Sequence, residues 1–114
     1  MTGDLLPVAV GLLNKPGQTR TVAFLLRLAL EHEVDAFWLR AALPTLPRAP
    51  MRTQLLCLTA YTAPSTAARL HSLWSQLSQA CHYHSYELSP TVHELHHWHH
   101  ELLSLLPLPL KPPP

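Results

Sequence analysis

The segment from Thr62 to His84 spaces its apolar residues as an α-helix requires. Five apolar side chains recur three or four positions apart, so a helix would carry all of them on one face. These residues are Leu70, Leu73, Trp74, Leu77 and Cys81. A chain whose clearest element is an amphipathic helix must bury that face against other helices, and this requirement sets the fold class.

Proline and glycine residues divide the rest of the chain into segments of helical length. We predict further helices over residues 20–33 and 49–61, a short one within 34–47 that Pro44 and Pro47 stop, and a last one with Ser89 as N-cap and Pro90 at its first position. No segment alternates apolar and polar residues as a strand does. The sequence therefore predicts an all-α fold, a compact bundle of about four to five helices, as a single domain over residues 1–106.

The last eight residues contain five prolines. Proline lacks an amide hydrogen and holds the backbone near polyproline II, so this segment cannot continue a helix. We expect residues 107–114 to form a disordered, Pro-rich C-terminal tail.

Charge and apolar content exclude several classes of protein. Eight Lys and Arg against seven Asp and Glu give a net charge of +1, which provides no broad cationic field for nucleic acid. The longest apolar runs, such as Leu5 to Leu13, are far shorter than the roughly 20 residues of a membrane span. No basic region precedes the first apolar run, so no signal peptide is expected. We expect a cytoplasmic protein with reduced thiols that binds neither nucleic acid nor membrane.

Five of the nine histidines lie within eight residues, from His93 to His100. A helical wheel centred on Leu95 places most of them on the solvent side, His96 on the boundary, and His99 alone in the apolar arc. The apolar arc consists of Val92, Leu95, Trp98, Leu102, Leu103, Leu105 and Leu106. The outward group consists of His93, His97, His100 and Ser104.

The string HELHH, from His93 to His97, matches the H-E-x-x-H pattern of zinc peptidases. In that pattern two histidines bind zinc and the glutamate serves as general base. A catalytic zinc needs a third protein ligand, yet Leu103 stands where the third histidine of the extended motif would come. The wheel also turns His93 and His97 to solvent. We therefore expect no peptidase activity.

A non-catalytic metal site is a stronger alternative. Histidines four positions apart on a helix present two imidazoles to one ion, and a second Cys and His group ends the preceding helix. A short linker would bring the two groups together. The candidate ligands for zinc or another divalent transition metal are Cys81, His82, His84, His93, His96, His97 and His100.

Arg27 and His32 have a spacing that resembles the R-x(4–6)-H motif of HEPN ribonucleases, which are small helical bundles that usually act as dimers. The resemblance implies that these two residues would form a nuclease site. Alternatively, His32 could form an ordinary ion pair with the adjacent Glu31.

The segment ACHYHSYELSPT, residues 80–91, resembles sequences of small, uncharacterised actinobacterial all-helical proteins. The resemblance implies an evolved bacterial domain, in contrast to a recently arisen reading frame, and it transfers no functional residue.

We interpret the chain as a small helical protein-interaction or regulatory domain without catalytic activity, which acts through a protein partner or as a homo-oligomer. The alternative is a metal-binding or pH-responsive module. Crowded histidines oppose one another's protonation, so stability is expected to fall as the pH drops toward 5. The ribonuclease is a remote third hypothesis.

Overall fold

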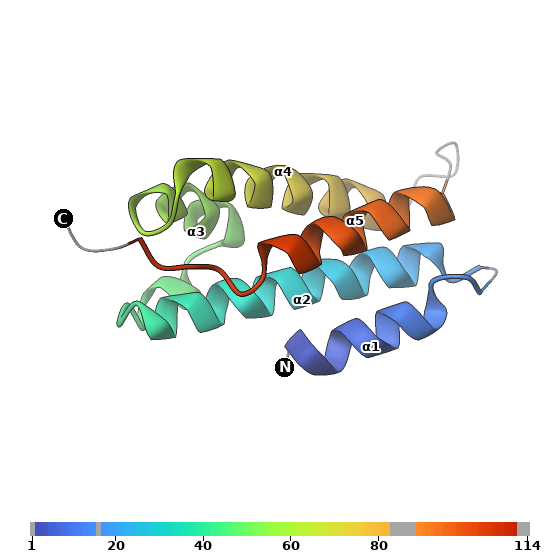
Figure 1. The fold of residues 1–114 in the computed structure, drawn as a ribbon, viewed down its shortest axis with the longest axis horizontal. Helices are drawn as coiled ribbons and strands as arrows, with labels where there is room; N and C mark the ends of the chain where they lie inside the picture. Colours follow the sequence, from blue (N-terminus) through green and yellow to red (C-terminus); the bar gives the residue numbers. More distant parts are fainter. Residues whose placement is uncertain (1, 16, 83–88, 112–114) are drawn as a thin grey trace.

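The computed structural model describes residues 2–15, 17–82 and 89–111, and it confirms the all-α prediction (Figure 1). All regular structure in these residues is helical. The α-helices are α1 (Thr2–Leu12), α2 (Thr19–Arg40), α3 (Met51–Cys57), α4 (Pro64–Cys81) and α5 (Val92–Leu105). Two 3₁₀-helices, η1 (Leu46–Arg48) and η2 (Leu58–Ala60), flank α3.

The central element is α2, because α1, α4 and α5 all pack against it. Figure 1 shows α4 and α5 along one side of α2 and α1 along the other. The buried residues of α2 are Val22, Ala23, Leu26, Ala29, Leu30, Glu33, Val34, Phe37 and Trp38. A helix buried on more than one side lets a chain of this size form a single core.

The apolar stripe predicted for residues 62–84 is confirmed in α4. Leu70, Leu73 and Leu77 are buried, and Trp74 and Cys81 are half-buried against the same core. The stripe faces α2 and α5, which are the main neighbours of α4.

The sequence prediction of two helices between residues 20 and 47 is wrong, because α2 continues without a break to Arg40. No proline or glycine separates its two halves, and Val34 and Phe37 extend the buried face. The helix ends before Pro44: the Leu43 amide donates to the Trp38 carbonyl at 2.8 Å, and the intervening Ala42 adopts a φ of 60°. This is the hydrogen-bond pattern of a Schellman motif, which usually has glycine at that position.

The apolar run near the N-terminus forms α1, a helix for which the sequence analysis made no prediction. It includes Pro7 and packs against α2, its main neighbour. Neither α1 nor any other helix in the described part of the chain is long and apolar enough to cross a membrane.

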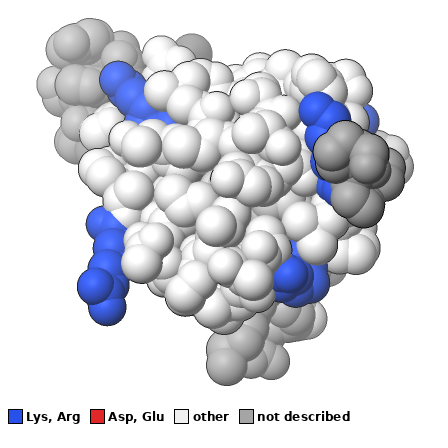
Figure 2. Space-filling model, turned by 90° about the vertical axis from the view of Figure 1, so that its left-hand side faces the viewer, with Lys and Arg blue, Asp and Glu red and all other residues white. Residues whose placement is uncertain are grey.

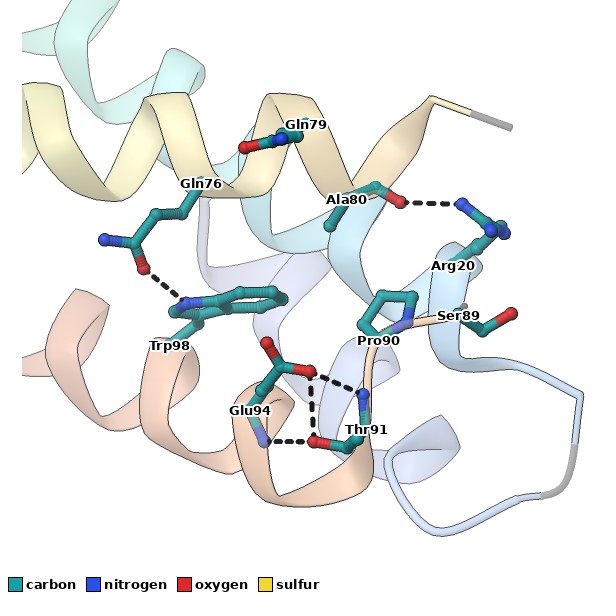
Figure 3. A pocket seen from close by; sticks show the side chains of 9 residues that line it. All are labelled: Arg20, Gln76, Gln79, Ala80, Ser89, Pro90, Thr91, Glu94 and Trp98. Carbon is teal, nitrogen blue, oxygen red and sulfur yellow. Dashed lines mark hydrogen bonds between the residues drawn. The ribbon is translucent and has the colours of Figure 1, made fainter. Parts of the chain in front are cut away.

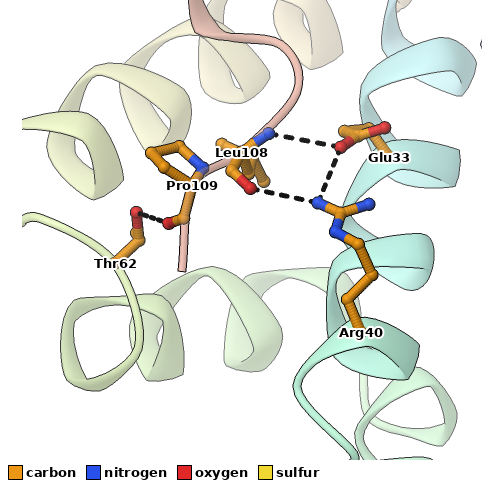
Figure 4. A network of polar contacts seen from close by, with 5 residues as sticks. All are labelled: Glu33, Arg40, Thr62, Leu108 and Pro109. Carbon is orange, nitrogen blue, oxygen red and sulfur yellow. Dashed lines mark hydrogen bonds and ion pairs between the residues drawn. The ribbon is translucent and has the colours of Figure 1, made fainter. Parts of the chain in front are cut away.

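The C-terminal segment contacts the bundle where it is described, over residues 107–111. Leu108 is buried, its amide donates to Glu33 Oε1 at 3.3 Å, and its carbonyl accepts from Arg40 Nη2 at 3.0 Å (Figure 4). Thr62 Oγ1 donates to the Pro109 carbonyl at 2.6 Å. Prolines remove donors but leave carbonyls, and side chains of the bundle satisfy those carbonyls. The remainder of the predicted tail, residues 112–114, lies outside the described residues.

Candidate functional site

The helix that carries the histidine cluster begins two residues later than expected. Thr91, and not Ser89, is the N-cap of α5, and Pro90 precedes the helix. The Glu94 amide donates to Thr91 Oγ1 at 3.0 Å, and the Thr91 amide donates to Glu94 Oε1 at 3.0 Å (Figure 3). This reciprocal capping box uses the glutamate of the HELHH string for a structural purpose.

The predicted division of the histidines between solvent and core is confirmed. His93, His96, His97 and His100 are exposed, whereas His99 is half-buried. The apolar arc is narrower than predicted, because Val92 and Leu103 are exposed. Among the described elements, α2 and α4 are the main neighbours of α5, and they cover the narrower arc.

Those predicted metal ligands that the structure describes do not form one group. Cys81 lies half-buried at the end of α4, packed against the core. Burial raises the pKa of its thiol, which disfavours the thiolate that binds metal. Among the described residues, no three His, Cys, Asp or Glu side chains lie close enough together to hold one ion. His84 lies outside those residues.

A hollow of about 560 Å³ lies between the end of α4 and the start of α5 (Figure 3). Its polar groups are largely paired with one another. Trp98 Nε1 donates to Gln76 Oε1 at 2.7 Å, and Arg20 Nη1 donates to the carbonyls of Ala80 and His82 at 3.2 and 2.6 Å. The lining residues are Arg20, Gln76, Gln79, Ala80, Ser89, Pro90, Thr91, Glu94 and Trp98. The Thr91 hydroxyl lies 3.1 Å from Glu94 Oε1, but this contact belongs to the capping box that begins α5. These side chains shape the helix ends.

A smaller hollow, of about 280 Å³, lies on the other side of Trp98 and includes His97. Arg69 Nε donates to Glu101 Oε1 there at 2.9 Å. That hydrogen bond is the main reason why the pKa of Glu101 is lowered. Because these two charges are engaged with each other, they offer little attraction to a charged ligand.

The pair proposed for a nuclease site has other partners in the structure. Arg27 Nε lies 3.8 Å from Glu31 Oε2, and the same oxygen accepts a hydrogen bond from Trp74 Nε1 at 2.9 Å. Glu31 thus pairs with Arg27 and Trp74, whereas the sequence suggested His32 as its partner. His32 lies near Asp35, whose pKa burial raises while His32 opposes that shift.

Half-buried His99 gives the bundle a pH dependence whose sign follows from its environment. Burial lowers its pKa, and neighbouring His96 and His100 lower it further. The unfolded chain then binds this proton more readily, so stability is expected to fall as the pH drops below the ordinary histidine value of about 6.5. Thermal melting between pH 8 and pH 5 tests this. We expect His99→Gln to reduce the pH dependence of the melting temperature. Substitution of the exposed His93 by Gln should leave that dependence unchanged. An unchanged slope for His99→Gln would contradict the assignment.

Charge is distributed unevenly along the chain, a feature hidden by the net charge. All seven acidic residues lie at positions 4–35 and 87–101, whereas five of the eight basic residues lie outside those ranges. These five are Arg40, Arg48, Arg52, Arg69 and Lys111. We call the end of the bundle formed by the last turn of α2, by η1, α3 and η2, and by residues 107–111 the basic end. Among the residues that Figure 2 colours, this end shows Lys and Arg and no Asp or Glu.

The basic end is held together by the buried side chain of Gln54 in α3. Its Oε1 accepts from Trp38 Nε1 at 3.0 Å, and its Nε2 donates to the carbonyls of Ala49 at 2.8 Å and Pro47 at 3.3 Å. The Trp38 ring meets Tyr61 edge-on, with 5.5 Å between centroids. The Lys111 amide donates to the Tyr61 carbonyl at 2.7 Å. These contacts join α2, η1, α3 and the C-terminal segment into one platform.

In comparisons with known proteins, no protein-family model, no curated protein and no solved structure matches the chain. The resemblances to actinobacterial helical proteins and to HEPN ribonucleases therefore stay predictions.

Proposed function

We propose that the protein is a helical protein-interaction domain that self-associates through α1. The observation that carries this proposal is the exposed apolar surface of α1 and the adjacent part of α2. Val8 is 52% exposed and Val10 47%, and Phe24 of α2 is 46% exposed. A helix that is apolar on all sides is normally buried, yet α1 has only α2 as its main neighbour. Val8 and Val10 are two positions apart, on either side of the buried Ala9, so α1 exposes apolar side chains on both of its flanks. Exposed apolar surface of this kind marks contact sites.

A second copy of the chain fits this surface for reasons of charge and shape. In a two-fold symmetric contact, residues near the axis meet their own counterparts, so a charge there would face a like charge. Between Asp4 and Lys15 the chain has no charged residue. Exposed Gly11 has open space around the position of a Cβ atom, so two helices can approach closely there. We place this oligomer in the cytoplasm, where free thiols such as Cys57 and Cys81 persist.

Val10→Glu is expected to weaken self-association by more than about tenfold, because a carboxylate would be buried in an apolar contact. Sedimentation equilibrium of wild type and variant measures the dissociation constant. Thermal melting of the variant should stay close to that of the wild type, since Val10 is half exposed within one chain.

The matched control is Leu103→Glu on α5, where the leucine is 48% exposed, nearly as much as Val10 at 47%. This control should associate as the wild type does. A wild type that stays monomeric at high concentration, or a Val10→Glu variant that associates normally, would rule out the proposed contact.

A further inference from the structure

We infer that the basic end binds an acidic protein segment that also carries apolar side chains. This contact is separate from the α1 surface and does not depend on self-association. Two of the five basic residues named above form ion pairs. Arg40 pairs with Glu33 at 3.1 Å, and Arg69 of α4 pairs with Glu101 at 2.9 Å. The remaining three cations, Arg48, Arg52 and Lys111, are exposed and have no carboxylate partner within the described part of the chain.

Exposed leucines accompany these cations. Leu39 at the end of α2 is 66% exposed, Leu56 in α3 is 64% exposed, and Leu110 in the C-terminal segment is 45% exposed. Arg52 and Leu56 are four positions apart on α3, which makes them neighbours on its outer face. A partner that contacts this face therefore meets a cation beside an apolar side chain.

The platform under this surface is ordered before any partner arrives. The hydrogen bonds of Gln54 connect α3 to η1 and to Trp38 of α2, and the Lys111 amide is bonded to Tyr61. A contact surface carried by elements that are already fixed loses little conformational entropy on binding.

The chemistry of the surface favours a protein over other anionic partners. Three unpaired cations contribute only about 3 kcal/mol at an anionic membrane, less than stable anchoring requires. Nucleic-acid sites combine phosphate contacts with base stacking or groove readout, and leucines supply neither. The ring of Tyr61, which is 36% exposed, is held edge-on against Trp38. In protein interfaces, by contrast, apolar anchors bury at the centre while charges at the rim select the partner.

The test is selection from a random peptide library on the full chain, followed by fluorescence anisotropy with the enriched peptides. We expect peptides rich in Asp and Glu together with Leu or aromatic residues. Arg52→Glu should weaken their binding by about tenfold or more, because it replaces an attraction with a repulsion. Lys15→Glu changes the net charge equally at the opposite end of α2, so its affinity should stay near the wild-type value.

Leucine variants separate apolar contact from charge alone. Leu56→Ser should weaken binding severalfold, whereas Leu103→Ser on α5 should not. Val10→Glu should bind the peptides normally, so failure of the α1 contact and failure of this one are distinguishable. Enriched peptides without acidic excess, equal losses for Arg52→Glu and Lys15→Glu, or tighter Arg52-dependent binding to phosphatidylserine vesicles or single-stranded DNA would overturn the inference.

Discussion

Replacing Gln54 by leucine is expected to lower the free energy of unfolding by about 3 kcal/mol. The side chain is 2% exposed, and its amide makes three hydrogen bonds. Leucine has a similar size but leaves the fully buried Trp38 indole without an acceptor. The substitution also removes the Gln54 Nε2 donor, whose hydrogen bond to the Pro47 carbonyl joins α3 to η1. Urea denaturation, followed by tryptophan fluorescence, measures the loss.

Gln76→Leu is the matched control, because Gln76 also accepts a hydrogen bond from a tryptophan indole, that of Trp98. Gln76 is exposed, so water can replace its amide, and the expected loss is below about 1 kcal/mol. Similar losses of unfolding free energy for the two variants would show that burial of Gln54 does not determine its contribution to stability. The Gln54→Leu variant is also expected to bind acidic peptides less well if its remaining structure is intact.

Glu33→Ala is expected to destabilise the fold by about 2 kcal/mol and to release the C-terminal segment. The carboxylate accepts from Arg40 and from the buried Leu108 amide, at 3.1 and 3.3 Å (Figure 4). Arg40 is partly exposed and recovers water, which keeps the cost below that of a fully buried pair. The Leu108 amide has no such replacement. Its hydrogen exchange, measured by NMR, should become much faster than that of Leu73 in α4.

Two further variants locate the effect. Glu33→Gln keeps an oxygen that can accept from the Leu108 amide, so it should protect that amide better than alanine does. Thr62→Val removes only the hydrogen bond to the Pro109 carbonyl and should loosen the segment without affecting Arg40. If the exchange of the Leu108 amide were unchanged in Glu33→Ala, the carboxylate would not be what holds the segment.

The helical faces were predictable because their apolar spacing is local information. The spacing of Leu70, Leu73 and Leu77 identified the buried side of α4, and the wheel centred on Leu95 identified that of α5. The outward position of most histidines followed from the same wheel. Periodicity reports which side of a helix is buried, and it needs no knowledge of the partner helix.

Helix boundaries were less predictable, because they depend on competition between neighbouring signals. Ser89 and Thr91 are both good N-caps, and the choice of Thr91 depends on Glu94 standing three positions later. The end of α2 depends on Ala42 adopting a conformation typical of glycine, which the sequence does not indicate. The docking of residues 107–111 depends on Glu33 and Arg40, which are far away in the sequence.

The candidate surfaces were the least predictable part. A net charge of +1 averages over the whole chain and conceals an end where Arg48, Arg52 and Lys111 have no carboxylate partner among the described residues. The distribution of Asp and Glu along the sequence contained this signal, but only the fold places Arg52 and Lys111 at the same end. The linker length correctly indicated that the end of α4 lies beside the start of α5, because residues of both ends line one hollow. It did not indicate that Cys81 itself packs against the core, which raises the pKa of its thiol.

The contact between the Leu108 amide and Glu33 spans 75 positions, which has a consequence for the order of folding. Helices α1 and α2 are neighbours in sequence and can pair early, at little cost in loop entropy. The Glu33 carboxylate obtains Arg40 from its own helix at once, but its backbone partner arrives only after α3, α4 and α5 are in place. We therefore expect the C-terminal segment to dock last during folding and to open before global unfolding.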